Sequence, residues 1–90
     1  MSKQNSFFLA DSVSVTEVNN ELVLLDFNTG QYFGLNHVGA DFIQFNQDGL
    51  SLTAAIEKIA NKYDTESMVV REDLEALITQ LKQQKLIIDA

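Results

Sequence analysis

The chain has 90 residues, of which 46% are apolar, and its 13 acidic and six basic side chains give a formal net charge of −7. This length and apolar content fit one small domain with one core and exclude wholesale disorder. The charge argues against nucleic acid and anionic membranes as partners, because clustered Lys and Arg bind their phosphates.

Cysteine is absent, so a disulfide framework and a thiolate metal site are both excluded. No apolar segment approaches the roughly 18 residues of a membrane span. The N-terminal apolar run, Phe7 to Ala10, is too short for a secretory signal. We therefore expect a cytoplasmic protein that forms a single domain over residues 1 to 90.

The N-terminal residues 1 to 10 are expected to form a flexible arm, although Phe7, Phe8 and Leu9 are apolar enough to pack against the domain. A first strand is expected from Val13 to Val18, where apolar and polar residues mix at strand spacing. Asn19 and Asn20 then predict a turn.

The next segment predicts a hairpin. Two apolar runs flank Asn28-Thr29-Gly30, and Asn and Gly tolerate the positive φ of a tight turn. The runs are Val23, Leu24, Leu25 and Phe27, then Tyr32, Phe33 and Leu35. From Gln31 to Asn36 there is no charge and no proline, although natural edge strands are usually protected by such residues. The second strand is therefore either covered by the fold or open to a partner strand.

Three helices are expected after the hairpin. Asn36 and Ser51 can cap the first two, and Gly49 can end the first in a left-handed conformation. The apolar stripes at helical spacing are Val38, Phe42, Ile43 and Phe45, then Leu52, Ala55, Ile56, Ile59 and Tyr63, then Val70, Leu74, Leu77, Ile78 and Leu81. Residues 86 to 88 are expected to return to the core. Three antiparallel strands followed by three helices make an α+β fold.

Residues able to carry out chemistry are few. His37 is the only histidine, and no serine lies in a Gly-x-Ser-x-Gly motif. Asp41 and Asp48 are expected to be solvated carboxylates rather than a catalytic pair. Residues 46 to 57 match a calcium loop at three positions but lack its central glycine. We expect no enzymatic activity, no metal and no cofactor.

The third helix carries mixed charges beside its apolar stripe. Val70, Leu74 and Leu81 are expected to lie in the core. A helix packed obliquely against a small sheet rarely buries so wide a stripe, so Leu77 or Ile78 is expected to line a groove beside the strand edge. The sequence leaves open which of the two does so.

Together these residues resemble the PqqD family. The most specific part is the run Tyr32 to Asn36, followed by Val38-Gly39-Ala40 and by Asp48-Gly49. The likeness covers about residues 13 to 88, and its further matches are Leu24-Leu25-Asp26, Thr29-Gly30-Gln31, Tyr63-Asp64, Asp73-Leu74, Leu77, Leu81 and Leu86-Ile87.

The resemblance implies a winged-helix-like domain, the RiPP recognition element, which binds the leader of a ribosomally made precursor peptide. The leader would add as a strand to the third strand, lie against the third helix and be delivered to a modifying enzyme or leader protease. Of the systems that use this domain, we favour lasso-peptide biosynthesis for this chain.

Two surfaces would form the peptide-binding site that the resemblance implies. Their residues are Gln31, Tyr32, Phe33, Gly34 and Leu35 on the third strand, with Arg71, Asp73, Leu74, Leu77, Ile78 and Leu81 on the third helix. By strand alternation, Phe33 and Leu35 share one face, which we assign mainly to the core, and Tyr32 and Gly34 share the other.

Two other functions remain as alternatives. A winged-helix DNA-binding protein has similar elements, but Glu72, Asp73 and Glu75 would give its recognition helix the wrong charge for phosphates. A small enzyme or carrier domain would need a nucleophile, metal ligands or a cofactor loop, and the sequence provides no such motif.

Overall fold

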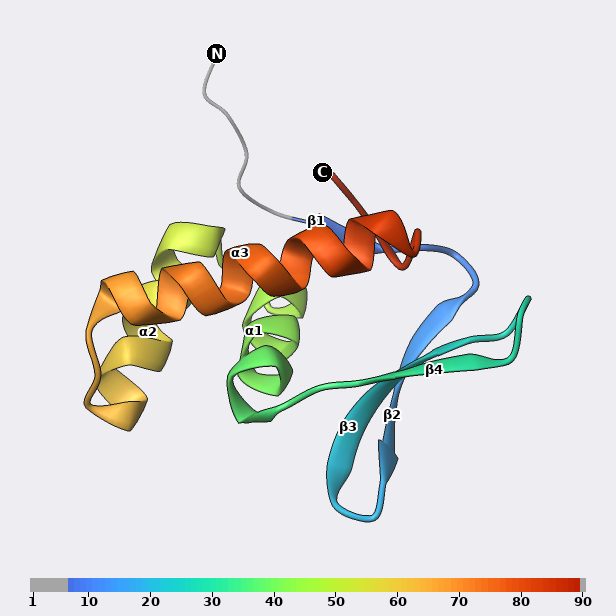
Figure 1. Ribbon diagram of the computed structural model, residues 1–90, viewed down its shortest axis with the longest axis horizontal. Helices are drawn as coiled ribbons and strands as arrows, with labels where there is room; N and C mark the ends of the chain where they lie inside the picture. Colours follow the sequence, from blue (N-terminus) through green and yellow to red (C-terminus); the bar gives the residue numbers. More distant parts are fainter. Residues whose placement is uncertain (1–6, 90) are drawn as a thin grey trace.

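In the computed structural model, which describes residues 7 to 89, a twisted three-stranded sheet lies beside a layer of three helices (Figure 1). The sheet contains β2 (Val13–Val18), β3 (Glu21–Asp26) and β4 (Gln31–Gly34), and the helices are α1 (His37–Gln47), α2 (Leu52–Tyr63) and α3 (Ser67–Gln83). The expected α+β fold, with an antiparallel sheet followed by three helices, is confirmed. "Winged-helix-like" describes it only loosely.

The sheet is a meander in the order β2-β3-β4, with both pairs antiparallel. Asn19 and Asn20 connect β2 to β3, and both have positive φ, 53° and 68°. This is the conformation of a two-residue hairpin turn with the twist of its strands. Gly30, with φ of 75°, provides the positive φ in the turn before β4.

The expected helix caps are present. The Asn36 side chain accepts a hydrogen bond from the Gly39 N–H at 2.8 Å, and Ser51 accepts one from Ala54 at 3.2 Å. Gly49 adopts φ of 95° directly after α1. The N–H groups of Gly39 and Ala54 lie in the first turns of their helices, where backbone N–H groups have no partner within the helix.

The core lies among the three helices, with Leu24 of β3 and with Phe7 and Ile87 of the β1–β5 pair packed against them. Its largest fully buried side chains are Phe42, Leu24, Ile43, Ile56, Ile59, Leu74, Leu81 and Val70. They come from β3 and from all three helices, so the apolar stripes predicted for the helices converge on one core.

A second sheet changes the expected N-terminus. β1 (Phe7–Leu9) pairs antiparallel with β5 (Ile87–Asp89), so these three residues of the expected arm are a strand. Phe7 is buried, and its backbone N–H and carbonyl both bond the Asn46 side chain, at 3.1 and 2.6 Å. The rest of the expected arm before Phe7 lies outside the described residues.

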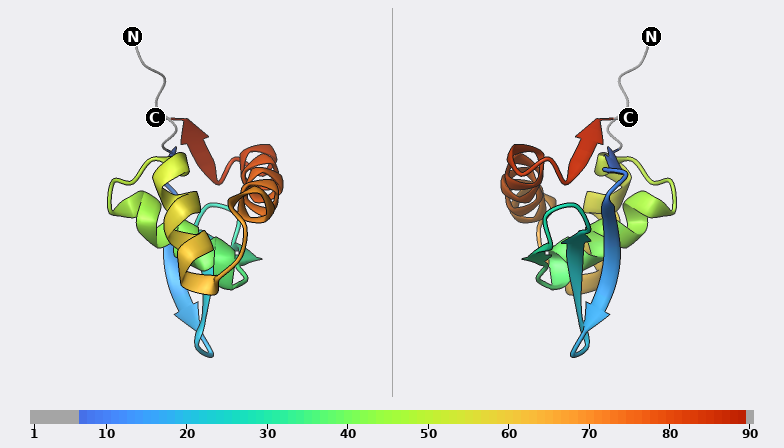
Figure 2. Two further views of the ribbon diagram at one scale, coloured as in Figure 1. Left: turned by 90° about the vertical axis from the view of Figure 1, so that its left-hand side faces the viewer. Right: turned by 90° about the vertical axis from the view of Figure 1, so that its right-hand side faces the viewer.

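The C-terminal strand agrees in part with the expected return to the core. Leu86 and Ile87 are buried, whereas Ile88 is exposed, opposite Phe8 of β1. Ile88 was expected in the core, but alternation along β5 turns its side chain to the outer face. β5 lies at the opposite end of the molecule from the β2–β3 turn (Figure 2).

A polar contact joins α1 to the end of α2. Lys62 Nζ lies 3.0 Å from both carboxylate oxygens of Asp41, and the Tyr63 hydroxyl donates to the same carboxylate at 2.6 Å. The hydrogen bond to Asp41 raises the pKa of Lys62, and the pKa of Tyr63 is raised for the same reason. Asp41 was expected to be a solvated carboxylate, but its side chain is only 15% exposed and it is a structural acceptor for both residues.

Candidate functional site

β4 is an edge strand, because it pairs with β3 alone. Phe33 lies opposite Leu24, and the Leu35 N–H donates to the Leu22 carbonyl at 3.1 Å. Bonding alternates along an antiparallel strand, so Phe33 and Leu35 direct their backbone polar groups toward β3. Tyr32 and Gly34 direct theirs outward, where no strand among residues 7 to 89 pairs with them.

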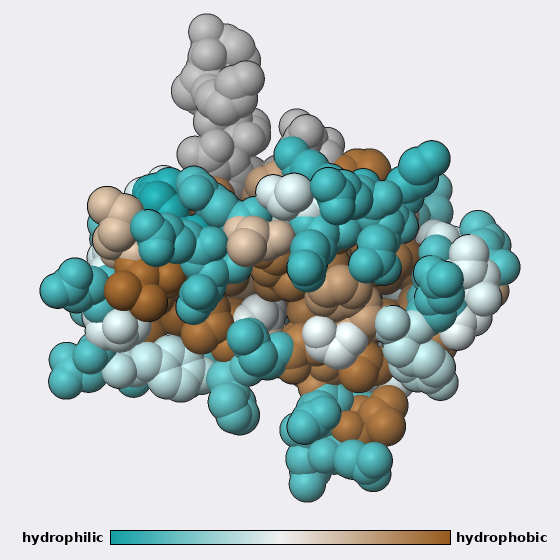
Figure 3. Space-filling view, in the orientation of Figure 1, coloured by the Kyte–Doolittle hydropathy of each residue, from teal (hydrophilic) through white to brown (hydrophobic). Residues whose placement is uncertain are grey.

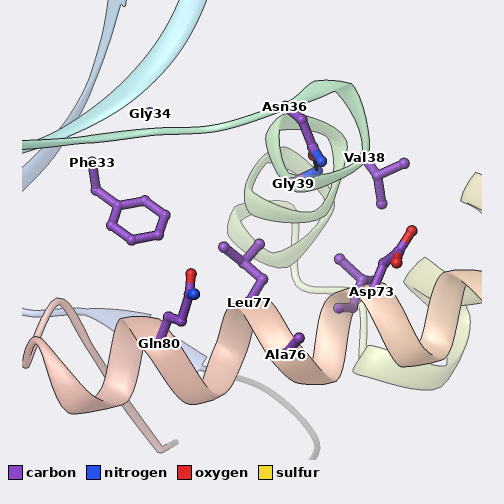
Figure 4. Close-up of a pocket in the computed structure, with 10 residues that line it drawn as sticks. Phe33, Gly34, Asn36, Val38, Gly39, Asp73, Ala76, Leu77 and Gln80 are labelled. Carbon is purple, nitrogen blue, oxygen red and sulfur yellow. Dashed lines mark hydrogen bonds between the residues drawn. The ribbon is translucent and has the colours of Figure 1, made fainter.

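A groove of about 370 Å³ runs between this open edge and α3. Figure 4 shows Phe33 pointing into it from the strand, with Leu77 and Gln80 pointing into it from the helix. The lining residues are Phe33, Gly34, Asn36, Val38, Gly39, Asp73, Leu74, Ala76, Leu77 and Gln80. In the space-filling view, apolar surface is visible below the largely polar outer side of α3 (Figure 3).

Gly39 sets the distance between α1 and α3 at one wall of the groove. A Cβ atom there would lie 3.1 Å from Leu77 Cδ2 and 3.3 Å from Asn36 Oδ1. Both distances are shorter than ordinary van der Waals contact, so the missing side chain lets Leu77 and the capping Asn36 sit close together. Gly34 differs, since a Cβ there would meet nothing within 4 Å.

One charged side chain lines the groove in the part of the chain that the structure describes. Asp73 is exposed on α3 and lines the groove near Val38 (Figure 4). Arg71 lies 3.7 Å from Glu75 on the same helix and does not line the groove. The remaining lining side chains are uncharged. Asn36 and Gln80 are polar and the larger ones, such as Phe33 and Leu77, are apolar, so the groove is a mixed surface with one negative charge at its rim.

The structure brings five of the expected site residues to the groove: Phe33, Gly34, Asp73, Leu74 and Leu77. Phe33, assigned mainly to the core, is only partly buried and points into the groove. Leu77 lines the groove, whereas Ile78 is buried in the core. The question left open by the sequence is thus decided in favour of Leu77.

The other expected site residues lie outside the groove lining. Leu35 and Leu81 are buried, and Gln31 and Tyr32 are exposed on β4. The groove also contains lining residues that sequence analysis did not identify: Asn36, Val38, Gly39, Ala76 and Gln80. Ala76 and Gln80 follow Asp73 at helical spacings of three and seven, a signal that could have placed them on one face.

A second hollow of about 300 Å³ adjoins the groove, since Asn36 lines both. Leu22, Leu35 and His37 are among its other lining residues. Among residues 7 to 89, no group of three or more His, Cys, Asp or Glu side chains is placed to hold a metal ion. No helix in that part of the chain is long and apolar enough to cross a membrane.

Comparison with known families gives one match. The family described as coenzyme PQQ synthesis protein D (PqqD) matches residues 21–87, a range that includes β4, the whole groove and α3. No curated protein matches the sequence significantly.

Comparison with solved structures gives two close folds. One is described as lasso peptide synthetase B1 complexed with the leader peptide; it has 30% sequence identity and a TM-score of 0.84, over 92% of this chain and 98% of that chain. The other is TbiB1 in complex with the TbiA(beta) leader peptide, with 28% identity and a TM-score of 0.77, over 88% and 92% of the two chains.

Proposed function

The chain belongs to the PqqD family, and from that membership we propose that it is a leader-peptide-binding adaptor, a RiPP recognition element. It captures a ribosomally made precursor peptide by its leader and delivers it to a modifying enzyme or leader protease. Both similar structures contain a leader peptide, and one of those proteins is a lasso peptide synthetase component. The class of product we propose is therefore a lasso peptide.

The observation that carries this proposal is the open edge of β4 beside the groove. The outward N–H and carbonyl groups of Tyr32 and Gly34 can pair with an extended peptide as a further strand. Such backbone bonds contribute about 0.5–1.5 kcal/mol each and are nearly independent of sequence. Specificity therefore comes from side chains in the groove.

Within the proposed site, Tyr32 and Gly34 of β4 supply backbone pairing, and Phe33, Asp73 and Leu77 contact the leader's side chains. Leu74 forms the buried floor. Leu35, Ile78 and Leu81 support these contacts from the core. Arg71 acts only at the margin, since it lies outside the groove lining.

The adaptor role requires no chemistry by the chain, and we propose that it has no catalytic activity and uses no cofactor. We also propose that it acts in the cytoplasm, where ribosomal precursors are made. The DNA-binding alternative has no support from the comparisons. In addition, α3 exposes Glu66, Glu72, Asp73 and Glu75 near its N-terminal half, which phosphates would repel.

The test is a pair of substitutions at Gly34. Gly34→Pro removes an N–H that points away from β3, so the pairing with β3 is kept, as is usual for proline on an edge strand. Gly34→Ala keeps that N–H, and its Cβ meets nothing within 4 Å. We expect Gly34→Pro to weaken leader binding by about tenfold or more and Gly34→Ala to bind within about twofold of wild type.

The measurement is a fluorescence-anisotropy titration with a labelled peptide, the leader half of the precursor encoded beside this chain. Circular dichroism melts of both variants check that the domain remains folded. Equal affinity of wild type and a folded Gly34→Pro variant would overturn strand addition at β4.

A further inference from the structure

We infer that the groove selects leaders by two side chains, a large apolar residue seated between Phe33 and Leu77 and a Lys or Arg two positions away that faces Asp73. The inference rests on the proposed leader binding and specifies the chemistry of the peptide that this site accepts. Backbone pairing at β4 alone predicts neither the apolar residue nor the basic residue of the leader.

The apolar half follows from the groove walls. Phe33 projects from β4 and Leu77 from α3 toward the same space (Figure 4), and the fully buried Leu74 lies beneath them. An apolar side chain placed there would exchange water for contacts with both walls, at about 25 cal/mol per Å² of apolar surface buried.

The basic half follows from the single charge in the groove. Among residues 7 to 89, Asp73 is the only charged residue that lines the groove. Two basic side chains elsewhere already have acidic partners, since Lys62 bonds Asp41 and Arg71 lies beside Glu75. No basic residue in the described part of the chain lines the groove, so the peptide is the source from which a cation beside Asp73 would come.

The net charge of the whole chain also favours a basic peptide. The chain carries a net charge of −7, which attracts basic peptides and repels acidic ones over a distance of about 10 Å at ordinary salt. An acidic leader would meet both this field and the Asp73 carboxylate. Charge complementarity therefore singles out a basic residue at that position.

The spacing follows from the geometry of a helix and a strand. In Figure 4, β4 faces the Gln80 end of the groove, and the chain that follows it to Asn36 runs alongside α3 toward Leu77. A peptide strand that pairs with β4 and continues along this path leads toward Asp73. Four helical residues separate Asp73 from Leu77, which is about 6 Å along the axis. Two residues of an extended peptide span about 6.7 Å, and alternate side chains face the same side. A basic residue two positions from the apolar anchor therefore reaches Asp73.

The inference can be tested with a display library of random 15-residue peptides selected on immobilised protein. We expect wild type to enrich peptides with a large apolar residue and a Lys or Arg two positions away. Asp73→Asn should keep the apolar preference and lose the basic one, and Asp73→Lys should replace it with Asp or Glu. Glu72→Gln, one residue away and outside the groove lining, is the matched control and should behave as wild type.

A titration completes the test on the best selected peptide. Replacing its basic residue with Gln should weaken binding about fivefold to wild type and by less than about twofold to Asp73→Asn. A purely structural role of Asp73 would instead lower the melting temperature of Asp73→Asn and leave peptide selection unchanged. That result, or enrichment of the basic residue at another spacing, would overturn the inference.

The two proposals fail in different ways. Apolar enrichment without any charge preference contradicts the inference and leaves leader binding intact. Failure of the encoded leader itself to bind the folded wild-type protein contradicts the proposed function, and the inference with it.

Discussion

Leu77 and Ile78 are neighbours on α3 with different surroundings. Leu77 is partly buried and lines the groove, whereas Ile78 is 7% exposed and belongs to the core. Successive residues of a helix point about 100° apart, so adjacent members of a wide apolar stripe meet different neighbours. The two positions therefore separate binding from folding.

We predict that Leu77→Asp weakens leader binding by about tenfold or more, because it replaces an apolar wall of the groove with a charge, and that the domain stays folded, because this charge is still reached by water. Ile78→Asp should destabilise the domain by about 3 kcal/mol or more, since it buries an unpaired carboxylate. Urea denaturation and anisotropy titration measure the two effects. Glu57→Ala, on the exposed face of α2, is the control and should change neither quantity; equal binding losses in Leu77→Asp and Glu57→Ala would contradict the groove.

Some single residues could be predicted and others could not. The caps at Asn36 and Ser51 depend on local hydrogen bonds and were identified from sequence. Gly39 could not be read as a groove residue, because its role depends on Leu77, which is 38 positions away and reaches it only when α1 and α3 pack together. Phe33 is spaced along its strand as a core residue would be. The sequence does not show the position of α3, which leaves Phe33 facing a groove.

At the scale of elements, the order of β2, β3 and β4 and of the three helices followed from local periodicity and turn residues. β1 and β5 did not, because each is three residues long and their pairing joins opposite ends of the chain. Loop closure over such a separation depends on the whole fold being formed. Local pattern predicted the sheet that carries the groove and missed the small sheet that closes the domain.

The contact among Asp41, Lys62 and Tyr63 leads to a prediction about pH. Hydrogen bonding to Asp41 raises the pKa of Lys62 above its ordinary value of 10.5 and the pKa of Tyr63 above its ordinary value of 10.0. Both protonated forms are favoured by folding, so the stabilisation is complete below those ordinary values. It is lost as the pH rises through the folded-state pKa values.

We therefore predict that the melting temperature of wild type exceeds that of Asp41→Asn at neutral pH and that the difference shrinks above about pH 10. The effect should be small, because the contact lies at the surface and is screened by solvent. Circular dichroism melts from about pH 7 to about pH 12 measure it. Glu57→Gln should keep a constant offset from wild type, and a difference for Asp41→Asn that does not change with pH would contradict the assigned protonation states.

The main sheet of the molecule has two edge strands, β2 and β4, and β4 is the one that lies beside the groove. β2 is the other edge strand, but it carries the charged Glu17, and the N–H of Val13 is already bonded by the Ala10 carbonyl at 2.9 Å. β4 is uncharged and lies beside α3. A peptide strand at β4 can gain backbone and side-chain contacts together.

We predict that leader binding shifts the amide NMR signals of residues 31 to 39 and 70 to 82 most strongly. β2 and the polar contact around Lys62 should shift little, because they lie outside the groove. A ¹⁵N-labelled sample titrated with the leader peptide gives the map. If the largest shifts lay along β2, the peptide would bind at the sheet edge opposite to the one proposed. Equal shifts along β2 and β4 would mean that the peptide binds at both edges.

The pairing of β1 with β5 places Phe7 directly opposite Asp89, so the first and the last residues that the structure describes lie side by side. A domain with this arrangement can be set into a surface loop of a host protein as a cassette, because the host chain is interrupted without its loop ends being forced apart. Such a chimera would carry the groove on an unrelated enzyme, which would then bind substrates that have a leader peptide attached.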